Sequence, residues 1–170
     1  MEKGFSLHTP RTIMRMLTVQ DAEDFYRLNL NPEVLQYTGD HPFVDIQEAA
    51  DFLAQYDQYE RHGVGRFAVI EKASNAFIGW CGLRYCQTKK EYDIGFRFFQ
   101  AYWNQGFATE TAKKCLEDGF NRLQIDSILG RAMIKNIASI KVLEKLGMQF
   151  KEKFDFEGQE GVIYEWFRRR

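Results

Sequence analysis

The feature that most constrains this chain is a change of hydrophobic period near residue 100. Residues 91–99, EYDIGFRFF, alternate as in a half-buried strand, with Asp93 and Arg97 opposite the apolar side chains. Residues 107–122 then repeat apolar side chains at helical spacing. A strand that leads into an amphipathic helix predicts a helix packed on a sheet, and therefore a mixed α/β fold.

The rest of the chain extends this pattern. Further strands are predicted at residues 12–17, 66–72, 77–86, 126–134, 149–158 and 160–168, and further helices at residues 18–29, 45–61 and 136–146. Residues 31–44 hold two prolines and a glycine and are predicted as a loop. We expect one domain, 1–170, with a mixed, mostly antiparallel sheet of about seven strands and helices on both faces. The expected order is β-α-α-β-β-β-α-β-α-β-β.

Composition excludes several classes of protein. Lys and Arg (23) nearly balance Asp and Glu (24), so the chain has no global basic field for nucleic acid. The three cysteines form no C-x-x-C pair and the three histidines are scattered, which argues against a disulfide framework or a metal site. The chain has no apolar run of about 18 residues and no signal-like N-terminal stretch. We expect a cytoplasmic protein that binds neither membranes nor metals.

The junction between the strand and the helix, YWNQGFATET at residues 102–111, suggests an anion site. Gly106 and Ala108 open the helix, where backbone N–H groups lack intrahelical partners. Small residues let an anion approach these donors, and the helix dipole favours negative charge there. The stretch is neither a P-loop nor a dinucleotide fingerprint. A pyrophosphate held by backbone amides fits it, although small residues at a helix start also serve close packing.

The run YDIGFRFFQAYWNQGFATETA closely resembles the acyl-CoA-binding core of the GCN5-related N-acetyltransferase (GNAT) superfamily. The resemblance is greatest to the branch that contains the ribosomal-protein N-terminal acetyltransferases. It extends to TPRTIMRMLTVQDAEDFYRL, FIGWCGL and NIASIKVLEKLGM, in the family's order. The resemblance implies an acyltransferase that moves an acetyl group from acetyl-CoA, as co-substrate, to a primary amine by direct attack.

The resemblance also implies the cofactor contacts. Gly106 and Ala108 match the family signature Gln/Arg-x-x-Gly-x-Gly/Ala, whereas Trp103 replaces its first residue, so we expect Trp103 to brace the loop. The backbone of residues 96–98 is expected to pair with the pantetheine arm like an added strand. The expected cofactor-binding residues are Phe96, Arg97, Phe98, Asn104, Gln105, Gly106, Phe107, Ala108, Thr109 and Asn136. Asn136 is also the expected cap of its helix.

Two residues are candidates for catalysis by resemblance. Asp93 stands before IGF, where similar enzymes often carry a glutamate base; the alternative is a carboxylate paired with Arg97. Ser139 is the candidate acid near the CoA sulfur; the alternative is a hydroxyl that supports the helix start. Many relatives use a tyrosine further along this helix, but the matching position here is Leu143.

The acceptor amine is open at this stage. About a tenth of an α-amine is neutral at pH 7, against under a thousandth of a lysine, so an α-amine needs little help from a base. A protein N-terminus, a small amine (polyamine, amino sugar or aminoglycoside) and a non-catalytic acyl-CoA-binding module all fit, as do a monomer and a homodimer. Acidic and aromatic residues of the 31–44 loop and the last hairpin suggest a cationic acceptor: Glu33, Tyr37, Asp40, Phe43, Phe154, Asp155, Phe156, Glu157 and Glu160.

Overall fold

The structure is a computed structural model that describes residues 1, 4–156 and 158–167. Glu157, one of the acidic residues expected near the acceptor, lies outside the described residues.

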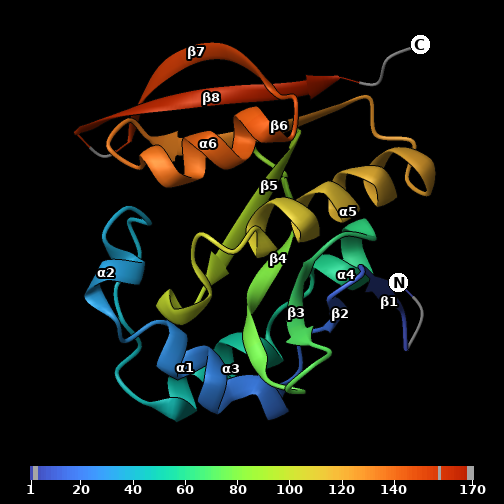
Figure 1. Cartoon of the computed structure of the whole chain (residues 1–170), viewed down its shortest axis with the longest axis vertical. Coiled ribbons are helices and arrows are strands. Elements are labelled where there is room, and N and C mark those ends of the chain that lie inside the picture. The colour runs from blue at the N-terminus through green and yellow to red at the C-terminus, as the bar shows by residue number, and fades with distance from the viewer. Residues whose placement is uncertain (2–3, 157, 168–170) are drawn as a thin grey trace.

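Eight strands form one sheet in the order β1-β2-β3-β4-β5-β6-β8-β7 (Figure 1). Every neighbouring pair is antiparallel except β5 and β6, which run parallel. The strands are β1 (Ser6–His8), β2 (Thr12–Met16), β3 (Arg66–Glu71), β4 (Phe77–Cys86), β5 (Glu91–Phe98), β6 (Ser127–Met133), β7 (Gln149–Phe156) and β8 (Gln159–Phe167). The mixed, mostly antiparallel sheet is confirmed. Its extra strand is β1, whose three residues are too few to show a period.

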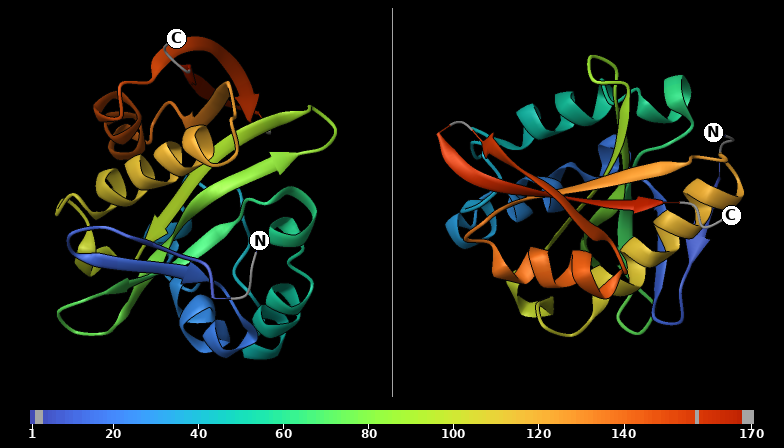
Figure 2. Two further views of the ribbon diagram at one scale, coloured as in Figure 1. Left: turned by 90° about the vertical axis from the view of Figure 1, so that its right-hand side faces the viewer. Right: turned by 90° about the horizontal axis from the view of Figure 1, so that it is seen from above.

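Helices cover both faces of the sheet, as expected, and Figure 2 shows α3 and α4 on the side opposite α5 and α6. They are α1 (Ala22–Leu28), α2 (Pro32–Leu35), α3 (Ile46–Ala54), α4 (Gln58–His62), α5 (Phe107–Asn121) and α6 (Ile137–Lys145), with short 3-10 turns η1 (Val19–Asp21) and η2 (Gln100–Tyr102). The predicted loop 31–44 contains the one-turn helix α2, which Asn31 caps and Pro32 begins. Four residues carry no helical period, so sequence patterning does not reveal it.

The helix predicted at residues 45–61 is wrong as a single element, because the structure divides it into α3 and α4. Two tyrosines explain the division. The backbone N–H of Arg66 donates to the hydroxyl of Tyr56 (2.9 Å), and that of Leu17 donates to the hydroxyl of Tyr59 (2.9 Å). These contacts with the sheet orient both rings, and tertiary hydrogen bonding overrides the continuous apolar stripe.

Two apolar clusters stabilise the two faces of the sheet. The larger cluster joins α5 and α6 to side chains such as Ile94, Phe98 and Ile128. The smaller cluster joins α1 and α3 to Ala68 and Trp80. The alternation predicted for β5 is therefore confirmed: its aromatic and aliphatic side chains lie on the α5 side, and Asp93 and Arg97 lie on the other.

The parallel pair β5–β6 is short. β5 pairs with β4 along its whole length, from Glu91 to Phe98, but pairs with β6 only at Asp93 and Ile94. Beyond this point β6 continues beside β8 while β5 runs toward η2 and α5 (Figure 1). The sheet therefore splits at Ile94, and the β6-facing backbone groups of residues 95–98 have no partner strand in the described part of the chain.

Candidate active site

The split sheet offers a binding edge next to the start of α5. Backbone N–H and C=O groups that lack a partner strand are a template for an extended ligand. The carbonyl oxygen of Phe98 already accepts a hydrogen bond from the indole Nε1 of Trp103 (2.8 Å). That bond ties the loop to the end of β5, which is the bracing role expected of Trp103. The strand edge that stays open is therefore centred on Gly95 to Arg97.

The loop that leads into α5 is built to present N–H groups. Asn104 (φ 59°) and Gly106 (φ 84°) are left-handed, and Gly106 occupies the N-cap position. A glycine adopts this conformation without a Cβ penalty. Among the described residues no side chain caps α5, so its first-turn N–H groups point out of the loop unpaired by a cap. This is the geometry of an anion site at a helix N-terminus.

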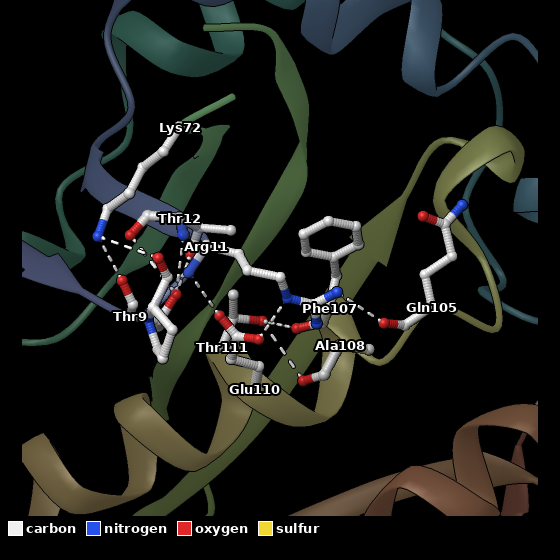
Figure 3. A network of polar contacts seen from close by, with 10 residues as sticks. Thr9, Arg11, Thr12, Lys72, Gln105, Phe107, Ala108, Glu110 and Thr111 are labelled. Atoms are coloured by element: carbon white, nitrogen blue, oxygen red, sulfur yellow. Dashed lines mark hydrogen bonds and ion pairs between the residues drawn. The ribbon is translucent and has the colours of Figure 1, made fainter. Parts of the chain in front are cut away.

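Arg11, from the turn between β1 and β2, holds this loop from outside (Figure 3). Its Nε donates to Glu110 Oε2 (2.8 Å), and its Nη1 donates to the carbonyl oxygen of Gln105 (2.9 Å). The guanidinium carbon lies 4.1 Å from the centroid of the Phe107 ring. Because the C=O and N–H of one peptide point in opposite directions, the bond to Gln105 turns the Gly106 N–H away from Arg11. Sequence patterning gave no sign of this contact across 94 residues.

Glu110 completes the anchor of Arg11. Burial acts to raise the pKa of this carboxyl group, but hydrogen bonds from Thr9 and Arg11 outweigh burial and lower it below its ordinary value. The carboxylate is therefore charged at neutral pH and keeps Arg11 in place on the side of α5.

Asp93 lies on the opposite face of β5 in a network of arginines. Its Oδ2 accepts hydrogen bonds from Arg84 on β4 (2.7 Å) and from Arg131 on β6 (3.2 Å). Arg131 also donates to Glu91 (2.5 Å). Asp93 is buried at the point where the sheet splits, so it lies beside the open strand edge. The carboxylate is paired with these two arginines rather than with Arg97.

The contact between Arg84 and Asp93 could be predicted from the sequence only if the register of β4 and β5 were known. With the β4–β5 hairpin pairing Cys86 with Glu91, counting back places Arg84 across from Asp93. The Arg131 contact depends on the parallel β5–β6 alignment, which sequence patterning did not fix.

Ser139 and Asn136 lie together at the start of α6. The side-chain oxygen of Asn136 accepts a hydrogen bond from the backbone N–H of Ser139 (3.1 Å), so the predicted cap is confirmed. Ser139 is partly exposed, and Leu143, one turn further on, is buried against Gly130. The structure thus brings Asn136 and Ser139 together; their expected contacts with CoA remain predictions.

The side chain of Arg97 has a partner set that the sequence did not indicate. It donates to the side-chain oxygen of Asn29 and to Asp40 Oδ2 (2.5 Å). Nearby, Gln100 of η2 donates to Glu33. Strand β5 is expected to bind pantetheine along its open edge. Through Arg97, on the face away from α5, it also holds the segment that runs from α1 to α3.

Three of the aromatic residues expected around the acceptor pack on other aromatic rings. The ring of Phe43 lies 5.7 Å from that of Phe25, and the ring of Phe154 lies 5.8 Å from that of Phe156. A Cβ added to Gly39 would come within 2.6 Å of Phe156, so the last hairpin touches the 31–44 segment there. These two segments therefore meet, and their contact with the acceptor remains a prediction.

None of the helices described is long and apolar enough to cross a membrane. Likewise, residues 1, 4–156 and 158–167 contain no group of three or more His, Cys, Asp or Glu placed to hold a metal ion.

Comparisons with known proteins agree with this geometry. Residues 11–149 match the family described as acetyltransferase (GNAT) domain. The uncharacterized N-acetyltransferase p20 of Bacillus licheniformis is 31% identical over 164 residues, which cover 94% of this chain and 92% of that protein.

Solved structures share the fold. An acetyltransferase (GNAT family) from Bacillus anthracis superposes with a TM-score of 0.83 at 22% identity, covering 96% of this chain and 98% of that one. RimL, a ribosomal-protein α-N-acetyltransferase solved in complex with coenzyme A, gives a TM-score of 0.83 at 13% identity and covers 96% and 98% of the two chains. The family match over most of the sequence, together with the split sheet and the open start of α5, shows that this chain belongs to the GNAT family and is an acetyl-CoA-dependent N-acetyltransferase.

Proposed function

We propose that the acceptor of this acetyltransferase is an α-amine, at the N-terminus of a protein or peptide. The observation that carries the proposal is the pairing of Asp93. Its Oδ2 is shared between the guanidinium groups of Arg84 and Arg131, so the carboxylate nearest the split of the sheet is not a free proton acceptor. The ammonium form of the acceptor must then lose its extra proton without the help of a strong base.

An α-amine meets this condition. With a pKa near 7.7–8.0, roughly a tenth of it is neutral at pH 7, against under a thousandth of a lysine side chain at about 10.4. The likeness to RimL, which is named for α-N-acetylation, supports the same choice at the level of the fold.

The reaction assigns roles to this chain's residues. The amides of residues 104–109 bind the pyrophosphate, and the open edge of Gly95 to Arg97 aligns the pantetheine arm. The neutral nitrogen attacks the thioester carbonyl carbon and loses one proton to water as the C–S bond breaks. The leaving thiolate takes a proton from Ser139, which regains one from water. Asp93 accepts a hydrogen bond from the amine through Oδ1, an oxygen with no bonded partner in the described part of the chain.

Thiol release from acetyl-CoA tests the proposal. Peptides with a free N-terminus are compared with Nα-blocked lysine peptides, polyamines and amino sugars at pH 7. We expect faster release with the free α-amines, and their kcat/KM to rise with pH and level off near pH 8, where the α-amine titrates. Equal or faster release with blocked lysine peptides or polyamines would contradict the proposal. No release with any amine would indicate an acyl-CoA-binding module.

A further inference from the structure

Arg66 begins β3 on the same face of the sheet as Asp93. It lies across from Gly82 on β4, which lies across from Gly95 on β5. Gly95 is the first residue of β5 beyond its pairing with β6. Because neighbouring strands lie about 4.8 Å apart, the Cα of Arg66 is roughly 10 Å from that of Gly95. The residues that lie across the strands from Arg66 toward the split, Gly82 and Gly95, are both glycines and add no side chain on this face.

The guanidinium group of Arg66 stacks on an aromatic ring. Its central carbon lies 4.3 Å from the centroid of the Trp80 ring. The Trp80 ring packs against Gly95, because a Cβ added to Gly95 would lie 3.2 Å from Cζ3 of the indole. The ring thus links Arg66 to the point where the sheet splits.

No hydrogen bond or ion pair joins this guanidinium to any other residue in the ranges 4–156 and 158–167. Burial is the main cause that lowers the pKa of Arg66, and the positive charges of Arg97 and Arg84 act in the same direction. A guanidinium offers five N–H donors in a rigid fork, so leaving all of them without a protein partner is unusual for a partly buried arginine.

The neighbouring arginines, by contrast, are all paired. Arg84 bonds Asp93, Arg97 bonds Asp40, and Arg131 bonds both Glu91 and Asp93. Four guanidinium groups on this face therefore meet three carboxylates, and Arg66 is the one left over. An anion would complete the set.

We propose that Arg66 binds an anionic group of the acceptor, a carboxylate or a phosphate, held in the fork of its guanidinium. The inference rests on the proposed function and adds the second recognition element of the acceptor. Amine and anion must lie within roughly 10 Å of each other, given the strand spacing between Arg66 and Gly95. An acidic side chain next to a peptide N-terminus satisfies this. A small amine that carries a phosphate has the same spacing and serves as the alternative in the test, since a preference for it would contradict the proposed α-amine. The sequence-based suggestion of a cationic amine stays a prediction, to which this proposal adds a negative charge close to the amine.

Paired acceptors test the proposal by acetylation kinetics. One arm uses peptide amides that are identical except for Asp or Asn as the second residue, which keeps the α-amine similar. The other arm compares phosphoethanolamine with ethanolamine and so distinguishes a small phosphorylated amine from a peptide. We expect a KM about 10- to 100-fold lower for the anionic member of the preferred arm, the range of a charge-assisted hydrogen bond.

The variant Arg66→Gln should abolish this difference while leaving the KM for acetyl-CoA and the rate with the neutral acceptor within about 2-fold. Arg66→Lys, which keeps the charge but loses the fork, should restore part of it. Lys113→Gln, an exposed residue on α5, removes one positive charge on the opposite face and should change nothing. Thermal melting of each variant establishes that it is folded.

Three results would overturn the proposal. Equal KM values for the anionic and neutral members of both arms would exclude an anion site, even though α-amine acetylation would stand. A loss in Arg66→Gln that is equal for both members would indicate a structural role for Arg66. A lower KM for an acceptor with a positive charge beside its amine than for one with a negative charge there would show the opposite charge preference. Failure of every α-amine to react, in contrast, would count against the proposed function itself.

Discussion

The two faces of β5 differ in what they offer a ligand. On the α5 side the strand is apolar, and the polar groups nearby are backbone amides of the strand and of residues 104–109. On the other side lie charged side chains from β3, β4, β5 and β6: Arg84 and Arg131 pair with Asp93, and Arg66 stacks on Trp80. We therefore propose that cofactor binding depends on backbone geometry and acceptor binding on side chains. Substitutions on the two faces should then have separable effects.

The largest effect is expected on the charged face, from Asp93→Asn. The change leaves Arg84 without its carboxylate and weakens the hold on Arg131, whose side chain is 17% exposed. Breaking a buried ion pair costs about 3–5 kcal/mol, and we expect about 2–3 kcal/mol because Arg84 is half-exposed. Urea unfolding measures this.

Asp24→Asn, in the exposed pair with Arg27, is the control and should cost under about 0.5 kcal/mol. If Asp93→Asn keeps its stability but loses more than about 100-fold in kcat, Asp93 acts as the general base, and the role given to the two arginines is wrong.

On the backbone face, Gly106→Ala should come next. A residue with a side chain at φ 84° is strained by about 1 kcal/mol, and the added Cβ would lie 3.5 Å from Nη2 of Arg11, which holds the loop. Relief of this strain should shift the loop whose amides are proposed to bind the anion. We expect the KM for acetyl-CoA to rise about 10-fold, with little change in the KM for the acceptor. Initial-rate kinetics with each substrate varied in turn measures both.

Gly147→Ala is the matched control, because Gly147 has a similar φ of 77° and open space around its Cβ, but lies at the end of α6. It should lose comparable stability and keep both KM values. An acceptor KM that rises as much as the cofactor KM in Gly106→Ala would break the division between the two faces.

Arg11→Gln should have a smaller effect on the same face. It removes the bonds to Glu110 and to the Gln105 carbonyl, which orient the loop rather than touch the cofactor. We expect a 3- to 10-fold rise in the KM for acetyl-CoA and a loss of under about 1 kcal/mol in stability, since Arg11 is 44% exposed. Arg61→Gln, which breaks an exposed pair on α4, is the control. An unchanged cofactor KM in Arg11→Gln would show that the loop keeps its shape without Arg11.

The smallest effect is expected from Asp40→Asn, which weakens the link between Arg97 and the 31–44 segment. Asp40 is 55% exposed, so the pair is screened by water and contributes little to stability. We expect a 2- to 3-fold rise in the acceptor KM and no change in the cofactor KM. The reverse pattern would place this segment on the cofactor side.

The same division explains how much the sequence could predict. The proposed cofactor half is local: residues 91–109 carry the strand, the left-handed glycine and the helix start in one stretch, so the change of period was enough to predict this strand and this helix. The acceptor half joins residues far apart in the chain. The pairing of Arg131 with Asp93 and the stacking of Arg66 on Trp80 follow from strand order and register, which a pattern of apolar residues does not specify. For the same reason the Arg11 anchor was not foreseen.

The most direct test of the proposed division between the two faces of β5 is a crystal structure with a bisubstrate analogue. In this analogue coenzyme A is joined through an acetyl carbon to the N-terminus of a peptide with Asp as its second residue. We expect the pyrophosphate at the amides of residues 104–109 and the pantetheine arm along Gly95 to Arg97. We also expect the Asp carboxylate within hydrogen-bond distance of the Arg66 guanidinium. A peptide that leaves the split on the α5 side, or a carboxylate turned into solvent away from Arg66, would contradict it.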